Sequence, residues 1–136
     1  MLRGLSTVTL TTDDVAAAAR WYADLLGVQP YFVRPEEGPP AYAEFRLGDD
    51  EDELGVMDAR YAAWPVGRPA GVVVHWHVDD LPAAVDRFAA HGGTVVQPAT
   101  VRGEGWATAV VADPFGNLLG FITSPHWAAA HAQLRR

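Results

Sequence analysis

The chain has 136 residues, of which 49% are hydrophobic, enough to build a folded core, and its lack of cysteine excludes disulfide bonds. Its formal net charge of −7, with few and unclustered Lys and Arg residues, argues against nucleic-acid binding. No apolar run is long enough to span a bilayer and no signal segment follows Met1, so we expect a cytoplasmic protein with no membrane partner.

The first half of the chain predicts one strand, one helix and three further strands. The pattern favours a strand over residues 5–11, a helix from Asp13-Asp14 to Gly27, and strands over 28–34, 41–47 and 54–58. Pro30 interrupts the second of these strands. The acidic run 49–53 is typical of a solvated hairpin turn, because it lacks the spaced oxygen ligands and the turn glycine of a calcium loop.

The second half repeats this order after a linker rich in proline and glycine, which we place at residues 63–70. The pattern predicts a strand over 72–78, a helix from Asp79-Asp80 to Gly92-Gly93, strands over 94–101, 106–112 and 118–122, and a hairpin turn over 113–117. We therefore predict a single domain over 1–124, made of modules 1–62 and 71–124, followed by a helical tail over 125–136.

A constant offset relates the two halves. Three features recur 66 positions apart: Asp14-Val15 and Asp80-Leu81, Tyr22 and Phe88, and Gly27 and Gly93. The strand before each helix alternates in the same register. In the second half the expected helix-facing side is Val72, Val74, Trp76 and Val78, and the opposite side is Val73, His75 and His77. The matching residues on the opposite side of the first strand are Thr7, Thr9 and Thr11.

Together these motifs resemble the vicinal-oxygen-chelate superfamily, which includes glyoxalase I, extradiol dioxygenases, fosfomycin-resistance enzymes and bleomycin-resistance binding proteins. The resemblance is carried by the two Asp-hydrophobe helix starts, the helix end Trp21-Tyr22-Ala23-Asp24-Leu25-Leu26-Gly27 and the turn Asp113-Pro114-Phe115-Gly116-Asn117. It extends to about Ser124 and implies an α+β fold, with two tandem βαβββ modules forming curved mixed sheets around a cleft. It does not fix the function, because this fold hosts many chemistries.

The resemblance also implies where a metal would bind. Metal-dependent members place a His on the first strand of each module and a Glu or another donor on each last strand. The equivalent residues here are Thr7, Gly55, Val73 and Gly120. Val and Gly offer no donor and Thr is a poor one, so the family metal site is expected to be absent. We therefore expect no metal and no other cofactor.

A relocated metal site is an alternative. His75 and His77 lie two positions apart on one strand, so their side chains share a face, and Glu53 is a third candidate ligand. The other interpretation makes both histidines polar wall residues that hydrogen-bond a ligand. His91, at a helix end, and His126 and His131, in the tail, are expected to be structural.

The expected ligand-binding residues line the faces that are not covered by helices. They are Thr7, Thr9, Tyr42, Met57, His75, His77 and Trp106. Trp106 and Tyr42, like Trp64, lie at strand starts or in the linker and are suited to stacking on a flat ligand, whereas Trp21, Tyr22, Trp76 and Phe88 are expected in the core.

The preferred interpretation is a binding protein of the bleomycin-resistance type, which holds a small, partly aromatic compound in a metal-free cleft and leaves it unchanged. The alternative is an enzyme of the lyase or dioxygenase type that uses a relocated metal or a histidine as acid and base. We expect a homodimer, because pairing covers open sheet edges and apolar surface.

Overall fold

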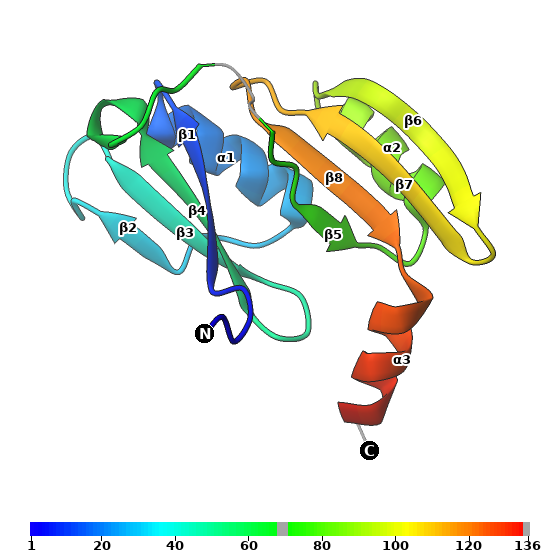
Figure 1. The fold of residues 1–136 in the computed structure, drawn as a ribbon. Coiled ribbons are helices and arrows are strands. Elements are labelled where there is room, and N and C mark those ends of the chain that lie inside the picture. Colours follow the sequence, from blue (N-terminus) through cyan, green and yellow to red (C-terminus); the bar gives the residue numbers. More distant parts are fainter. Residues whose placement is uncertain (68–70, 135–136) are drawn as a thin grey trace. The chain divides into compact units, whose positions relative to one another are not determined.

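The computed structural model describes residues 1–67 and 71–134 (Figure 1). Contacts divide the chain into two compact units, Met1–Arg68 with Phe115–Asn117 (unit 1) and Pro69–Pro114 with Leu118–Arg136 (unit 2). Each unit has a four-stranded mixed sheet with a helix packed on one of its faces. The predicted α+β fold of two tandem βαβββ modules is confirmed.

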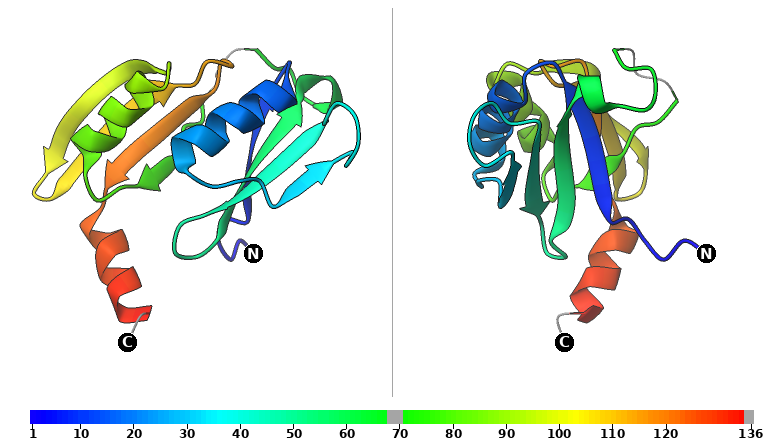
Figure 2. Two further views of the ribbon diagram at one scale, coloured as in Figure 1. Left: turned by 180° about the vertical axis from the view of Figure 1, so that it is seen from behind. Right: turned by 90° about the vertical axis from the view of Figure 1, so that its left-hand side faces the viewer.

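The sheet of unit 1 has the strand order β1-β4-β3-β2, in which β1 runs parallel to β4 and the other pairs are antiparallel. Its elements are β1 (Thr7–Thr12), α1 (Val15–Leu26), β2 (Phe32–Arg34), β3 (Tyr42–Leu47), β4 (Asp52–Asp58) and the short 3-10 helix η1 (Ala59–Tyr61). Helix α1 lies across one face of the sheet, which the view from behind shows (Figure 2).

Capping and burial explain why α1 forms where it does. The Asp14 side chain accepts a hydrogen bond from the Ala17 N–H at 3.0 Å, and the helix stops at Gly27, whose φ of 72° suits glycine. The core beneath it contains Tyr22 from the helix and, from the strands, Phe45, Leu54 and Val56, each at most 1% exposed. Apolar burial on this face leaves the other face of the sheet for polar side chains.

The sheet of unit 2 has the equivalent order β5-β8-β7-β6, again with one parallel pair, β5 with β8. Its elements are β5 (His75–His77), α2 (Leu81–Ala90), β6 (Thr94–Gly103), β7 (Trp106–Ala112), β8 (Leu118–Thr123) and α3 (Pro125–Leu134). Helix α2 packs on one face, with Leu81 and Val85 buried against Ala109. Just after α2, a Cβ on Gly93 would lie 2.0 Å from the Phe88 ring, so only glycine fits there.

The structure corrects one prediction about the central strand. Of the predicted strand 72–78, only His75–His77 forms β5, and Val72, expected to be buried, is 74% exposed. Although β8 begins at Leu118, it pairs with β5 only through Gly120–Ile122, with one more bond from the Gly120 N–H to the Val74 carbonyl, so residues before Val74 have no ladder partner on β8. The strand predicted over 28–34 is likewise confined to Phe32–Arg34, beyond Pro30, which has no N–H to donate.

Two predicted segments fall partly outside the described residues. The linker predicted at 63–70 is described to residue 67 and contains no helix or strand in that part, and the tail helix predicted over 125–136 is described to residue 134. The hairpin turn predicted at 113–117 is confirmed between β7 and β8. No helix in the described part of the chain is both long and apolar enough to cross a membrane.

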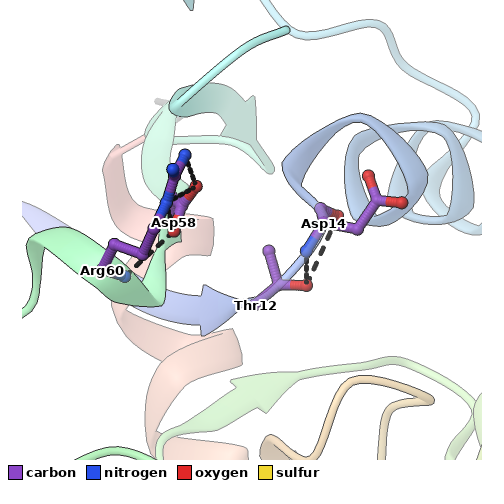
Figure 3. A network of polar contacts seen from close by, with 4 residues as sticks. All are labelled: Thr12, Asp14, Asp58 and Arg60. Carbon is purple, nitrogen blue, oxygen red and sulfur yellow. Dashed lines mark hydrogen bonds and ion pairs between the residues drawn. The ribbon is translucent and has the colours of Figure 1, made fainter.

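Buried polar groups at the ends of β1 and β4 have structural partners (Figure 3). Thr12, which is 4% exposed, accepts a hydrogen bond from the Asp14 N–H at 3.1 Å through its hydroxyl. Asp58, 7% exposed, accepts from the Arg60 backbone N–H at 2.9 Å and from its guanidinium at 2.7 Å. The hydrogen bonds from Arg60 hold the pKa of Asp58 below its usual value. These residues close turns of the chain and are not candidates for the functional site.

Candidate functional site

The candidate site in unit 1 is the sheet face opposite α1, which we call open face 1. Side chains alternate along a strand and paired residues share a face, so the strand register identifies its members. They are Thr7, Thr9 and Thr11 on β1, Phe32 and Arg34 on β2, Tyr42, Glu44 and Arg46 on β3, and Glu53, Gly55 and Met57 on β4. Of the predicted ligand-binding residues, Thr7, Thr9, Tyr42 and Met57 thus share one surface.

Glu44 is the residue of open face 1 that sequence reasoning missed. Its side chain is only 8% exposed, and its two carboxylate oxygens accept hydrogen bonds from the hydroxyls of Tyr31 and Tyr42. Tyr42 lies two residues away on β3, while Tyr31 precedes β2 and is held by a backbone bond from its N–H to the Glu44 carbonyl at 3.0 Å. A buried carboxylate is stable only when its oxygens have such partners.

The three groups perturb one another's ionisation. Burial alone raises the pKa of Glu44, but the hydroxyls of Tyr31 and Tyr42, a contact with Glu53 and the charge of Arg46 together bring it below its ordinary value. Burial and the bond to Glu44 raise the pKa of Tyr42 well above normal. The bond to Glu44, followed by burial, raises the pKa of Tyr31. At neutral pH this cluster therefore consists of one carboxylate and two protonated phenols.

Gly55 lies beside this cluster, directly under the Tyr42 ring. It pairs with Glu44 on one side and with Thr9 on the other, at the centre of open face 1. A Cβ at position 55 would be 2.4 Å from the Tyr42 hydroxyl oxygen and 2.9 Å from the adjacent ring carbon. The space that a side chain from this position would occupy is therefore filled by the phenol.

The equivalent face of unit 2, which we call open face 2, also has a central glycine covered by a ring, and here the ring is that of a histidine. It carries His75, Trp106, Thr108, Val110, Gly120 and Ile122. A Cβ at Gly120 would be 2.6 Å from the His75 ring, so this ring covers Gly120 as the Tyr42 ring covers Gly55. His75 is exposed, and Trp106, at the start of β7, is 39% exposed. Both flat side chains thus present surface to a ligand.

His77 is held by helix α3. Its side chain is 7% exposed, and its Nδ1 atom accepts a hydrogen bond from the Ser124 N–H at 3.2 Å. Its ring stacks on Trp127 with centroids 4.2 Å apart, and Trp127 in turn stacks on His131 at 3.7 Å. The second ring nitrogen lies 3.4 Å from an Asp79 carboxylate oxygen. These contacts support the interpretation of His131 as a structural residue. They also give His77, which the sequence predicted to bind the ligand, structural partners on both ring nitrogens.

The residues present do not fit the family metal site. Positions 55 and 120 have no side-chain donor, and the space above them is taken by Tyr42 and His75. A metal bound through the alternative set of His75, His77 and Glu53 would need the Nδ1 of His77 released from Ser124, or its Nε2 turned from Asp79. Among the described residues, no group of three or more His, Asp or Glu side chains is placed to hold a metal ion.

Comparison with known proteins identifies the family. The family model described as the glyoxalase/bleomycin resistance protein/dioxygenase superfamily matches residues 4–121. The chain belongs to this superfamily. The resemblance inferred from the two helix starts and the 113–117 turn is thereby confirmed at the level of the superfamily.

Individual relatives show how far the similarity extends. "Putative glyoxylase CFP32" of Mycobacterium bovis is 32% identical over 118 residues, which make up 83% of this chain but only 42% of that protein. A glyoxalase-related enzyme from Fulvimarina pelagi has a TM-score of 0.72 at 22% identity, covering 91% of this chain and 90% of its own. The fosfomycin resistance protein FosX of Listeria monocytogenes has a TM-score of 0.69 at 13% identity, with coverage of 91% and 95%. At such low identity the two structures establish the fold alone.

Proposed function

We propose that this superfamily member binds a small, partly aromatic compound on its open sheet faces, without a metal ion, and leaves the compound chemically unchanged. The proposal is supported chiefly by the residues at positions 55 and 120, which are glycines in place of metal-ligand side chains. Where metal-dependent members place donors, this chain has glycines covered by the rings of Tyr42 and His75. Rings at these positions exclude metal-ligand side chains and supply flat surfaces on which an aromatic compound stacks.

The side chains around these rings suit such a ligand. Met57 on open face 1 and Val110 with Trp106 on open face 2 offer apolar area, whose burial drives binding. Hydroxyls and the His75 ring supply a few polar groups, which orient a ligand. A fully polar or highly charged compound would gain little from these surfaces.

The proposal is tested by a thermal-shift screen of uncharged aromatic compounds on protein purified without an affinity tag. A hit raises the melting temperature, because a ligand that binds only the folded state stabilises it. Prolonged incubation followed by chromatography then shows whether the hit is recovered intact. Complete recovery supports binding, whereas turnover would support the alternative of a metal-dependent or histidine-assisted enzyme.

Elemental analysis of the same preparation tests the metal-free part of the proposal. We expect zinc, iron, nickel and manganese well below one ion per chain, and a melting temperature that does not change with chelator. A near-stoichiometric ion that disappears when His75 and His77 are both replaced by alanine would contradict the proposal and favour a relocated metal site.

Trp106 provides the test of where the ligand binds. Trp106→Ala should weaken binding of a screening hit by about 1–3 kcal/mol, the scale of a lost aromatic contact at a binding site, and leave the fold intact. Trp64→Ala is the matched control, since Trp64 is also exposed, at 52%, but lies outside both open faces. Equal affinities for all three proteins would exclude Trp106 from the binding surface.

A further inference from the structure

We infer that open face 1 selects aromatic ligands that carry a hydrogen-bond donor, because the hydroxyls of Tyr31, Tyr42 and Thr7 donate their hydrogen bonds to Glu44 and Glu53 and present their oxygens to the ligand as acceptors. This inference rests on the proposed function and names the class of compound that open face 1 prefers. Glu44 is a positioning residue in this scheme, since it acts on the ligand through the two phenols.

The direction of each hydroxyl proton follows from its partner. A phenol has one O–H, and an ionised carboxylate is only an acceptor, so Tyr31 and Tyr42 must both donate to Glu44. The same logic applies to Thr7, whose Oγ1 donates to the Glu53 Oε2 at 3.3 Å. Once its proton is committed, each hydroxyl oxygen retains only lone pairs for another partner.

The Glu44 carboxylate is ionised at neutral pH, which fixes the direction of both phenol bonds. The pKa of Glu44 lies below its usual value because the hydroxyl bonds and the charge of Arg46 outweigh the effect of burial. The pKa values of Tyr31 and Tyr42 lie above the ordinary value for tyrosine, so both phenols stay protonated and act as hydrogen-bond donors to Glu44. At neutral pH the phenol oxygens of Tyr31 and Tyr42 thus act as acceptors toward a ligand, which must bring the donor for a bond to either of them.

Two arginines lie on this face, and both already have partners. Arg34, which pairs with Tyr42 across the strands, has its guanidinium 4.1 Å from the Phe32 ring centroid and 3.3 Å from a Glu36 carboxylate oxygen. The Arg46 guanidinium lies 4.1 Å from the Tyr31 ring centroid. Tyr42, by contrast, holds its hydroxyl above Gly55 at the centre of open face 1. A flat compound lying against Tyr42 therefore meets the acceptor oxygen of that residue, and an N–H or O–H at the ligand edge forms the complementary bond.

The experiment compares two probes of nearly equal shape, indole and 1-methylindole, which differ by one N–H donor. Saturation-transfer NMR titrations with the full chain should show indole binding about five-fold more tightly, the scale of one hydrogen bond between neutral groups. Benzofuran, which replaces the N–H by an acceptor oxygen, should bind as weakly as 1-methylindole or more weakly.

Glu44→Gln provides the sharper test. An amide has one acceptor oxygen and one donor group, so one of the two phenols must now accept from the amide and point its own proton outward. The preference for indole should fall to two-fold or less, and benzofuran should gain affinity relative to the wild type. Tyr42→Phe, which keeps the ring above Gly55, should also abolish the preference. Tyr61→Phe, which removes a hydroxyl outside this face, is the control and should leave it unchanged.

The outcomes separate this inference from the proposed function. Equal binding of indole and 1-methylindole, or a preference unchanged in both Glu44→Gln and Tyr42→Phe, would overturn donor selection while binding itself stands. Failure of every uncharged aromatic compound in the thermal-shift screen would overturn the proposed function as well. A melting curve for each variant identifies any that do not fold. If Glu44→Gln does not fold, the indole preference of Tyr42→Phe alone tests donor selection.

Discussion

At the scale of single residues, the two glycines at the centres of the sheets determine what each open face contains. Gly55 and Gly120 lie under the rings of Tyr42 and His75. A Cβ added to either glycine would be less than 3.0 Å from the nearest ring atoms, closer than a Cβ tolerates. A protein interior packs at high density, and an added methyl group here displaces a ring or the backbone. Each ring can therefore occupy its position only because the residue beneath it is glycine.

Gly55→Ala should destabilise the protein by about 1–3 kcal/mol, the range for inserting a methyl group into a packed site. Gly103→Ala is the control, because Gly103 is also in a strand but its nearest neighbour to an added Cβ is 3.9 Å away, an ordinary contact. Urea denaturation of both variants measures the difference. Equal stabilities would show that the Tyr42 ring moves aside without cost.

The tyrosines bonded to Glu44 should titrate abnormally. Burial and the bond to Glu44 raise the pKa of Tyr42, so its proton stabilises the folded state below the ordinary value of 10.0, and this contribution is lost as the pH rises through the higher folded-state pKa. In ultraviolet titration of the folded protein, Glu44→Gln should move part of the phenolate signal to lower pH. Superimposable curves for wild type and Glu44→Gln would contradict the predicted coupling.

At the scale of elements, α3 was predicted as a helix but its contact was not, because it covers His77, a strand residue that the sequence assigned to the ligand-binding surface. Ser124 starts the helix, with its hydroxyl accepting from the Trp127 N–H at 3.1 Å and its backbone N–H donating to His77. Trp127 then lies between His77 and His131. The docking of α3 on β5 thus depends on a stack of three rings and one hydrogen bond.

Trp127→Ala should loosen α3 and make it the first site of proteolysis, since the stacking of Trp127 on both His77 and His131 is removed. His126→Ala, at an exposed position on the same helix, should leave the cleavage rate unchanged. Limited proteolysis with mass spectrometry measures both. If α3 of Trp127→Ala is cleaved no faster than the wild type, the stack does not hold the helix.

Sequence reasoning predicted the elements better than the contacts between them. The helix starts at Asp14 and Asp80, the glycine at the end of α1, and strand β7 all follow from local patterns, because capping and alternation act over a few residues. The burial of Glu44 could not be predicted, because a single Glu in a strand is usually exposed and one of its two phenol partners, Tyr31, is 13 positions away. The contact of His77 with Trp127 was missed for the same reason.

At the scale of the whole molecule, assembly remains a prediction. The strand order leaves β1 and β2 at the edges of one sheet and β5 and β6 at the edges of the other within the described residues. Open edges and exposed apolar side chains such as Val96 and Val101, which are 55% and 78% exposed, give a physical reason to pair. We predict a homodimer by light scattering at micromolar concentration, and a monomeric mass would refute it.

Under the proposed function, the protein binds an aromatic compound without a metal ion. The most direct measurement is a calorimetric titration of a screening hit into the protein before and after exhaustive treatment with chelator. We predict the same dissociation constant in both titrations, because the groups proposed to contact the ligand are side chains of the protein. Loss of binding after chelation, restored by adding one divalent ion per chain, would contradict it.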